Sequence, residues 1–227
     1  MARKGDPSGD ASMREREAND VIVEGLDAAT RELVELGIVI ATAREPELRA
    51  GMRRMVEARV NPEWVEELIL QSYIFAGFPR ALNAAREWRR ASAIPAPSTD
   101  ADALGDRYEL WRERGEATCA TVYGAAYYRL RANIRELHPA LDEWMIVEGY
   151  GKLLGRPGLD LSRRELCIVA VCGALEQERQ LHAHLHGALN AGATPQAIQD
   201  TLEIVAAHVD ADAAGRFAHL WNRVREQ

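Results

Sequence analysis

The chain has 227 residues, 47% of them apolar and 28% charged, which indicates a folded protein and excludes a mainly disordered chain. Its net charge is −7, and acidic residues are interleaved with the arginines along most of the sequence. This balance excludes a nucleic-acid-binding surface, because phosphate contacts need a local excess of Lys and Arg.

Helical periodicity dominates the chain. Apolar residues recur at i, i+3 and i+4, as at Leu33, Leu36 and Ile40, and alternating strand patterns are absent. Several helices open with a capping residue followed by proline, as in Asn61-Pro62 and Thr194-Pro195. The predicted helices span residues 28–43, 63–75, 122–137, 138–150, 163–175, 180–190 and 195–208, so the predicted fold is all-α.

Clusters of proline and glycine divide the chain. Residues 5–12 indicate a loose tail, and the AIPAPSTDAD run of residues 93–102 interrupts helix formation and is typical of a linker. The charge-rich segment 106–116 is expected to be a solvated helix face. We predict a flexible tail over residues 1–20, a first unit over 21–92, a linker over 93–106 and a second unit over 107–227.

Apolar segments and cysteines favour a cytoplasmic protein without a membrane partner. No apolar run approaches the roughly 20 residues that span a bilayer, and residues 1–16 lack the apolar core of a signal peptide. Cys119, Cys167 and Cys172 include no CxxC pair and are expected to be buried apolar residues. Core positions are also expected for seven aromatic residues, with Tyr150 as the exception most suited to a pocket: Tyr73, Phe75, Phe78, Tyr123, Tyr127, Tyr150 and Trp144.

The chain contains an internal repeat. A shift of 133 positions places Gly25-Leu26-Asp27 on Gly158-Leu159-Asp160, Arg31-Glu32-Leu33 on Arg164-Glu165-Leu166, and Pro62 on Pro195, without a gap. Such a repeat indicates one supersecondary unit used twice. Each unit is expected to contain a long buried helix, a second helix, and a third helix that begins at the proline.

The two copies differ in their histidines. All six histidines lie after the linker, and His184 of the second copy corresponds to Gly51 of the first. Likewise, His182 and His186 correspond to arginines. Imidazole chemistry is therefore expected only in the second copy.

A family resemblance rests on three segments. The run from Glu148 to Leu166 with its RPGLD motif, His184 with the ALNAG run of residues 188–192, and residues 73–83 resemble the carboxymuconolactone decarboxylase-like (alkylhydroperoxidase D-like) family. The resemblance covers roughly residues 25–92 and 110–224. It implies two tandem alkylhydroperoxidase D-like units in one compact all-α bundle, with no cofactor and no metal. It also implies a homo-oligomer, for which we expect a trimer of two-copy chains.

The peroxidase branch of this family carries a Glu-x11-Cys-x2-Cys-x3-His pattern. Counted from Glu165, the two cysteine places hold Gln177 and Gln180 before His184. Amides cannot replace a thiolate nucleophile and its resolving partner, so disulfide peroxidase activity is not expected. The glutamines either line the substrate site as amide donors or replaced the cysteines neutrally.

The decarboxylase branch implies His acid–base chemistry on a small lactone or carboxylic acid, as in aromatic-compound degradation. Arg156 suits a substrate carboxylate, because a guanidinium donates two parallel hydrogen bonds. His184 suits proton transfer near neutrality, and Glu165 or Glu148 would orient it. Tyr150, close to the RPGLD motif, is a further candidate for substrate contact.

Other interpretations stay open. The chain departs from the decarboxylases at Lys152 and Glu165, so another lactone, an oxo-acid or a cyclic compound would also suit the site. His182 and His186, spaced i, i+4, suit a metal, although no H-E-x-x-H motif accompanies them. Glu165 would alternatively pair with an arginine between the repeats. In a non-catalytic, ligand-binding family member, side chains would fill the space around His184.

Overall fold

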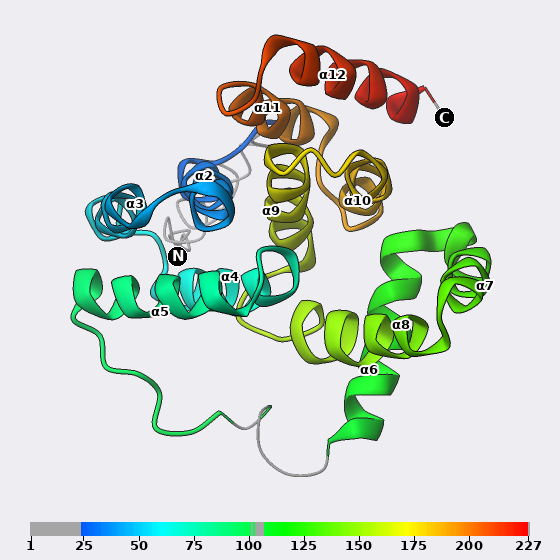
Figure 1. The fold of residues 1–227 in the computed structure, drawn as a ribbon, viewed down its shortest axis with the longest axis horizontal. Helices are drawn as coiled ribbons and strands as arrows, with labels where there is room; N and C mark the ends of the chain where they lie inside the picture. Colours follow the sequence, from blue (N-terminus) through cyan, green and yellow to red (C-terminus); the bar gives the residue numbers. More distant parts are fainter. Residues whose placement is uncertain (1–23, 101, 103–106, 227) are drawn as a thin grey trace, which may run out of the picture.

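The computed structural model describes residues 24–100, 102 and 107–226, and its regular structure is helical throughout (Figure 1). Within these residues there is no strand, which confirms the all-α fold. The predicted tail over residues 1–20 lies outside the described part of the chain. No helix in the described part combines the length and apolar character that a membrane crossing requires.

The helices fall into three groups along the chain. The first copy contains α2 (Ala28–Thr42), α3 (Glu45–Glu57), α4 (Pro62–Phe75) and α5 (Phe78–Ser92). The second copy contains α9 (Leu161–Ala174), α10 (Glu178–Asn190), α11 (Pro195–Ala206) and α12 (Ala211–Arg225). Between them lie α6 (Tyr108–Tyr123), the short 3-10 helix η1 (Gly124–Ala126), α7 (Tyr127–Leu137), α8 (Pro139–Trp144) and the π-helix η2 (Met145–Leu154).

The helix positions confirm the repeat. The helices α3, α4 and α5 begin at residues 45, 62 and 78, and their counterparts begin 133 positions later, at 178, 195 and 211. Asp27 and Asp160 cap the first helix of each copy, and each accepts a hydrogen bond from a backbone N–H three residues later. Within the described residues each copy has four helices rather than three, because α5 and α12 follow the third. The domain limits of 21–92 and 107–227 stay predictions.

The first helices of the two copies, α2 and α9, pack together at the centre of the molecule (Figure 1). Nε of Arg163 donates to Oγ1 of Thr30 at 2.8 Å. These residues are 133 positions apart, so each occupies the same place in its copy. A contact between equivalent residues is expected only on or near a two-fold axis.

Ion pairs away from this point come in equivalent pairs. Arg164 on α9 binds Glu67 on α4 at 2.8 Å, and Arg31 on α2 lies 3.8 Å from Asp200 on α11. Arg164 is Arg31 shifted by 133 positions, and Asp200 stands at the position of Glu67. The two copies therefore pack about a pseudo-two-fold axis, as the subunits of a dimer do.

The segment α6 to η2 covers one side of the second copy (Figure 1). Helix α6 crosses η2 at two glycines. A Cβ on Gly115 would lie 2.0 Å from the carbonyl oxygen of Ile146, and one on Gly151 would lie 1.9 Å from that of Trp111. Only glycines permit this approach. The expectation of a solvated face at 106–116 is therefore only partly right, because this helix buries its small residues against η2.

Two predicted helices have different limits. Residues 122–137 do not form one helix, because the chain breaks at Gly124, whose φ of 49° favours glycine. The helix predicted for 138–150 begins at Pro139 and continues as η2 to Leu154. The apolar pattern does not predict that helix α6 begins at residue 108. This helix buries only a narrow stripe of Gly115, Cys119 and Val122, and charged residues surround that stripe in the sequence.

The predicted core is right for the cysteines and wrong for three aromatic residues. All three cysteines are free and buried. Tyr127 and Tyr150 are buried, whereas Tyr73, Phe78 and Trp144 are 40%, 59% and 60% exposed. Helix α4 is apolar around most of its circumference, so periodicity alone does not show which face is exposed.

Candidate functional site

His184 and Glu165 form a buried pair. Glu165 lies on α9 and His184 on α10, with Nδ1 of His184 2.7 Å from Oε2 of Glu165. His184 is 5% exposed and Glu165 is fully buried. A carboxylate at Nδ1 fixes the orientation of the ring and leaves Nε2 as the nitrogen for exchanging a proton with a substrate.

The second oxygen of Glu165 is unusual. Oε1 is buried and has no hydrogen-bond partner in the described part of the chain. Buried carboxylate oxygens are generally paired, because burying an unpaired acceptor carries the full cost of desolvation. The site therefore contains an acceptor without a protein donor.

Two tyrosines lie near Glu165. Tyr123, at the end of α6, and Tyr150, on η2, have ring centroids 6.1 Å apart, and their hydroxyls interact. Burial raises the pKa of Tyr123 to about 12 and the pKa of Tyr150 well above its ordinary value, and the charge of Glu165 acts in the same direction. Both hydroxyls therefore stay protonated at neutral pH and remain hydrogen-bond donors.

Close packing of α10 brings His184 to Glu165. Gly187 on α10 faces α9 and α6, and a Cβ at this position would lie 2.7 Å from both Oε2 of Glu165 and Cγ1 of Val122. A side chain here would displace the carboxylate that holds the imidazole. The glycine is thus part of the construction of the pair.

The first copy also contributes to the site. Phe75, at the end of α4, packs edge-on against the ring of His184, with centroids 5.6 Å apart and an interplanar angle of 81°. The pseudo-two-fold packing places the end of α4 next to α10 of the other copy. The site is therefore built from both copies.

Three predicted residues have other neighbours. Glu148 on η2 pairs with Lys152, one turn later, at 3.1 Å. Gln177 and Gln180 are exposed at the start of α10, and Nε2 of Gln177 donates to the carbonyl of Leu175. None of the contacts found in the described part of the chain joins these residues to His184. Their roles stay predictions.

Arg156 is held by carboxylates of the protein. Its guanidinium binds Glu67 on α4 at 3.0 Å and Asp100 of the preceding segment at 2.9 Å. Glu67 also binds the buried Arg164, so this carboxylate joins two arginines. Asp102 is a third acid, 3.7 Å from this guanidinium, so a substrate carboxylate would have to compete with three acids for Arg156.

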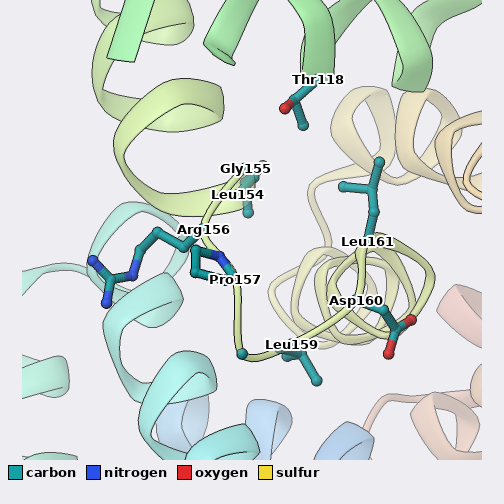
Figure 2. Close-up of a pocket in the computed structure, with 9 residues that line it drawn as sticks. Thr118, Leu154, Gly155, Arg156, Pro157, Leu159, Asp160 and Leu161 are labelled. Atoms are coloured by element: carbon teal, nitrogen blue, oxygen red, sulfur yellow. The ribbon is translucent and has the colours of Figure 1, made fainter. Parts of the chain in front are cut away.

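A hollow of about 450 Å³ lies beside the start of α9 (Figure 2). It is lined by the segment from Leu154 to Leu161 and by Thr118 of α6. Figure 2 shows the guanidinium of Arg156 turned away from Thr118 and Leu161. Neither member of the His184–Glu165 pair lines this hollow, so it does not bring Arg156 and the histidine together.

The first copy has a hollow at the place equivalent to the His184 site. Gly51 and His208, which occupy the positions of His184 and Phe75, line a hollow of about 610 Å³. Glu32, the glutamate of this copy, binds an arginine of α3 at 2.7 Å. The pseudo-two-fold axis therefore relates a closed histidine site to an open hollow without the His–Glu pair.

His182 and His186 lie on the same helix as His184. Their ring centroids are 5.0 Å apart, and burial together with the nearby His182 lowers the pKa of His186. Within the described residues, no group of three or more His, Cys, Asp or Glu side chains is arranged to hold a metal ion. The two imidazoles thus lack a third ligand there.

The sequence predicts core positions for Phe75 and Tyr123 and does not indicate their places at the site. Phe75 lies in the segment 73–83 that resembles the family, but nothing in that segment or around Tyr123 marks either residue as a site residue. The repeat holds a signal for Phe75. If the copies are taken as a two-fold pair, residue 75 faces residue 184 in the same way that residue 208 faces residue 51.

Comparison with known proteins points to one family. The sequence profile of the Carboxymuconolactone decarboxylase family matches residues 11–90 and 139–222. These two matches together cover well over half of the chain, and each falls on one copy of the repeat. The chain belongs to the carboxymuconolactone decarboxylase family. The resemblance and the two-copy arrangement predicted from the sequence are thereby confirmed.

Two individual relatives differ in extent. Peroxisomal protein 2 from Schizosaccharomyces pombe is 25% identical over 185 residues, which cover 79% of this chain and 86% of that protein. The 4-carboxymuconolactone decarboxylase from Acinetobacter baylyi is 41% identical over 61 residues, which cover 27% of this chain and 45% of that enzyme. The sequence identity to the decarboxylase is thus higher than the identity to Peroxisomal protein 2, but it spans less than half of the enzyme.

Proposed function

We propose that the protein is a cofactor-independent carboxy-lyase that removes CO2 from a small lactone bearing a carboxylate, as in the breakdown of aromatic compounds. The buried His184–Glu165 pair, with its unpaired Oε1, carries the proposal. An unpaired buried oxygen lowers the stability of the fold by about 1–3 kcal/mol. A pair with only a structural role gains nothing from this oxygen, so the cost favours a role in binding or catalysis. The similarity to the decarboxylase from Acinetobacter baylyi supports the same class of reaction.

One carbon–carbon bond breaks in this reaction and one carbon–hydrogen bond forms. The bond to the carboxylate breaks, CO2 leaves, and the electron pair delocalises into the conjugated lactone carbonyl. Nε2–H of the His184 imidazolium then gives its proton to carbon, and the imidazole regains a proton from water. Glu165 holds the ring through Nδ1 and stabilises its positive charge.

Two sets of residues would bind the substrate. Tyr123 and Tyr150 are neutral donors near Glu165 and suit the lactone oxygens. Arg156 suits the carboxylate once it releases Asp100, which is the most exposed of the three acids that hold it. Glu148, Gln177 and Gln180 would act only if substrate binding rearranges their present contacts.

A non-catalytic, ligand-binding protein is the second candidate. Phe75 covers the ring of His184, which is only 5% exposed. This burial favours a site whose space is filled by side chains. The two candidates differ in whether a bound lactone is consumed.

The test is the turnover of 4-carboxymuconolactone, followed by the loss of lactone absorbance. The wild-type chain is expected to consume the lactone, and His184→Ala is expected to lower kcat by about 10²–10⁴-fold. His219→Ala, a change of an exposed histidine on α12, is the matched control and is expected to keep wild-type activity. A fully active His184→Ala variant would contradict the proposal, and calorimetric binding without turnover would favour the second candidate.

The compartment and assembly are also proposals. The cytoplasm is the expected compartment, and the name of the Schizosaccharomyces pombe relative makes the peroxisome the alternative. Fluorescence microscopy of the tagged full chain distinguishes the two. The expected assembly is a homotrimer.

A further inference from the structure

The imidazole of His184 is almost closed off from solvent. The residue is 5% exposed, and the carboxylate of Glu165 occupies the Nδ1 side of its ring. A substrate that takes a proton from Nε2 has to come within about 3.2 Å of that nitrogen. A neighbouring side chain therefore has to move before a substrate binds.

Phe75 is the neighbour of the imidazole that can move at least cost. Its phenyl ring meets the imidazole edge-on, with centroids 5.6 Å apart, and the residue is only half-buried. Glu165, in contrast, is fully buried, and a Cβ on Gly187 would lie 2.7 Å from both Glu165 and Val122. The phenyl ring has no polar atom, so no hydrogen bond holds it in place. Phe75 thus contacts His184 and also reaches the surface.

Tyr123, the other half-buried ring near Glu165, is held more firmly. Its hydroxyl interacts with the hydroxyl of the buried Tyr150. Moving Tyr123 would leave the hydroxyl of Tyr150 without this partner, and a buried polar group without a partner is costly. The contacts of the site therefore favour entry past Phe75 over entry past Tyr123.

The first copy shows the same place in the fold without these two rings in contact. A shift of 133 positions relates Phe75 to His208 and His184 to Gly51. His208 is exposed and lines, together with Gly51, the hollow of about 610 Å³. The fold therefore keeps an open space here when the two side chains do not fill it. Removal of the Phe75 ring is expected to leave an opening beside the imidazole of His184.

We propose that Phe75 of the first copy determines which ligands reach His184 of the second. Its ring closes off the imidazole in the free protein, and the substrate displaces the ring when it binds. The space released is as flat and as wide as a phenyl ring, so it suits a flat, unsaturated lactone and excludes a bulkier one. This selectivity rests on the proposed decarboxylation, whereas the control of access to the imidazole does not.

Diethyl pyrocarbonate measures access to His184 without any turnover, because it acylates a free nitrogen of a neutral imidazole. Peptide mass spectrometry of the treated full chain gives the rate at each histidine. Phe75→Ala is expected to raise the rate at His184 by about 10-fold or more, since the open state of the wild type is a minor population. Phe75→Leu is expected to raise it less. His219, exposed on α12, is expected to react at the same rate in every chain.

Phe78→Ala is the matched control. It removes an exposed ring that lies three residues beyond Phe75 and contacts Tyr73, so the rate at His184 is expected to stay at the wild-type value. Circular dichroism verifies that every variant is folded. The proposal is overturned if Phe75→Ala leaves this rate unchanged or if Phe78→Ala raises it equally. It is also overturned if only Tyr123→Ala raises the rate, since ligands would then enter past Tyr123.

The selectivity is tested with two lactones, 4-carboxymuconolactone and a derivative with one more methyl group on the ring. Phe75→Ala is expected to raise the ratio of kcat/KM for the methylated lactone to kcat/KM for the parent by about 10-fold or more. An unchanged ratio would refute the selectivity. If neither lactone is consumed but the labelling of His184 still depends on Phe75, the decarboxylation fails and the control of access stands.

Discussion

Glu165 allows stability and chemistry to be separated at a single residue. Glu165→Gln keeps the shape of the side chain and removes a buried charge with one unpaired oxygen. We expect the variant to unfold at the same temperature as the wild type or higher, because the glutamine keeps an acceptor for Nδ1 of His184 and removes the cost of burying a carboxylate with an unpaired oxygen. Turnover is expected to fall by about 10²-fold or more, since the imidazolium loses its counter-ion. Thermal unfolding and initial rates measure the two effects.

The first copy supplies the control for this substitution. Glu32 occupies the equivalent position, but it binds Arg54 and has no histidine beside it. Glu32→Gln is expected to leave turnover unchanged. If both substitutions lower turnover equally, or if Glu165→Gln chiefly unfolds the protein, the role of Glu165 is structural.

The cysteines are expected to be unreactive in the folded protein. Burial raises the pKa of Cys119, Cys167 and Cys172 to about 12, so their thiolate population is negligible at neutral pH. Iodoacetamide is expected to leave the native chain unmodified and to add to all three free cysteines after denaturation. Intact mass spectrometry counts the adducts. Rapid labelling of the native chain would show that these helices open readily.

At this scale the sequence predicts residues better than it predicts their partners. The comparison of the two copies identifies His184, and the spacing of the family pattern identifies Glu165. The partners of Arg156 come from α4 and from the segment before α6, and no sequence pattern joins those segments. Contacts between distant segments depend on packing geometry, and the predicted carboxylate site at Arg156 therefore missed its protein partners.

At the scale of helices, the two equivalent ion pairs differ in environment. Arg164 is buried on α9 and binds Glu67, whereas Arg31 is 46% exposed at the side chain and lies 3.8 Å from Asp200. Arg164→Met removes one of the two guanidinium partners of the buried Glu67 and leaves several carbonyl oxygens without this donor. We expect it to lower the free energy of unfolding by about 3 kcal/mol or more.

The control is the same change at the equivalent position. Arg31→Met removes a partly solvated pair and is expected to cost less than about 1 kcal/mol. Urea unfolding of both variants gives the comparison. Equal losses would mean that burial does not set the strength of the contact between α9 and α4.

The helices of the repeat were predicted more closely than those between the copies. In α2, α9 and α11 a broad apolar face and a capping residue mark the limits, so periodicity is sufficient. Helix α6 buries only a narrow stripe of small residues, and η2 departs from the 3.6-residue period altogether. The sequence likewise does not show which face of α4 is exposed, because this depends on which other helices pack against α4.

Across the whole molecule, three buried thiols and a buried tyrosine make the free energy of unfolding sensitive to high pH. The pKa of three thiols and of Tyr123 rises from ordinary values of 9.0 and 10.0 to about 12 on burial. The folded chain thus keeps protons that the unfolded chain releases. The resulting stability is fully present below pH 9 and is lost as the pH rises through about 12.

Urea unfolding at a series of pH values between about 8 and 11 measures this loss. Tyr123→Phe removes one of the groups, so its decline above pH 10 is expected to be shallower than that of the wild type. A wild-type free energy of unfolding that stays constant through this range would contradict the assignment. Reading unfolding by circular dichroism avoids the absorbance change of tyrosinate itself.

The pseudo-two-fold axis has a genetic consequence. In a dimer of identical subunits every mutation appears on both sides of the axis, so a change that helps one side and harms the other is rejected. Joining the copies in one gene lets each side be inherited separately. Gly51 can stand in one copy while His184 stands in the other, and α5 can carry Phe78 and Leu82 where α12 carries Ala211 and Gly215. One polypeptide can thereby carry the His184–Glu165 pair in one copy and Phe75, which packs against the histidine, in the other.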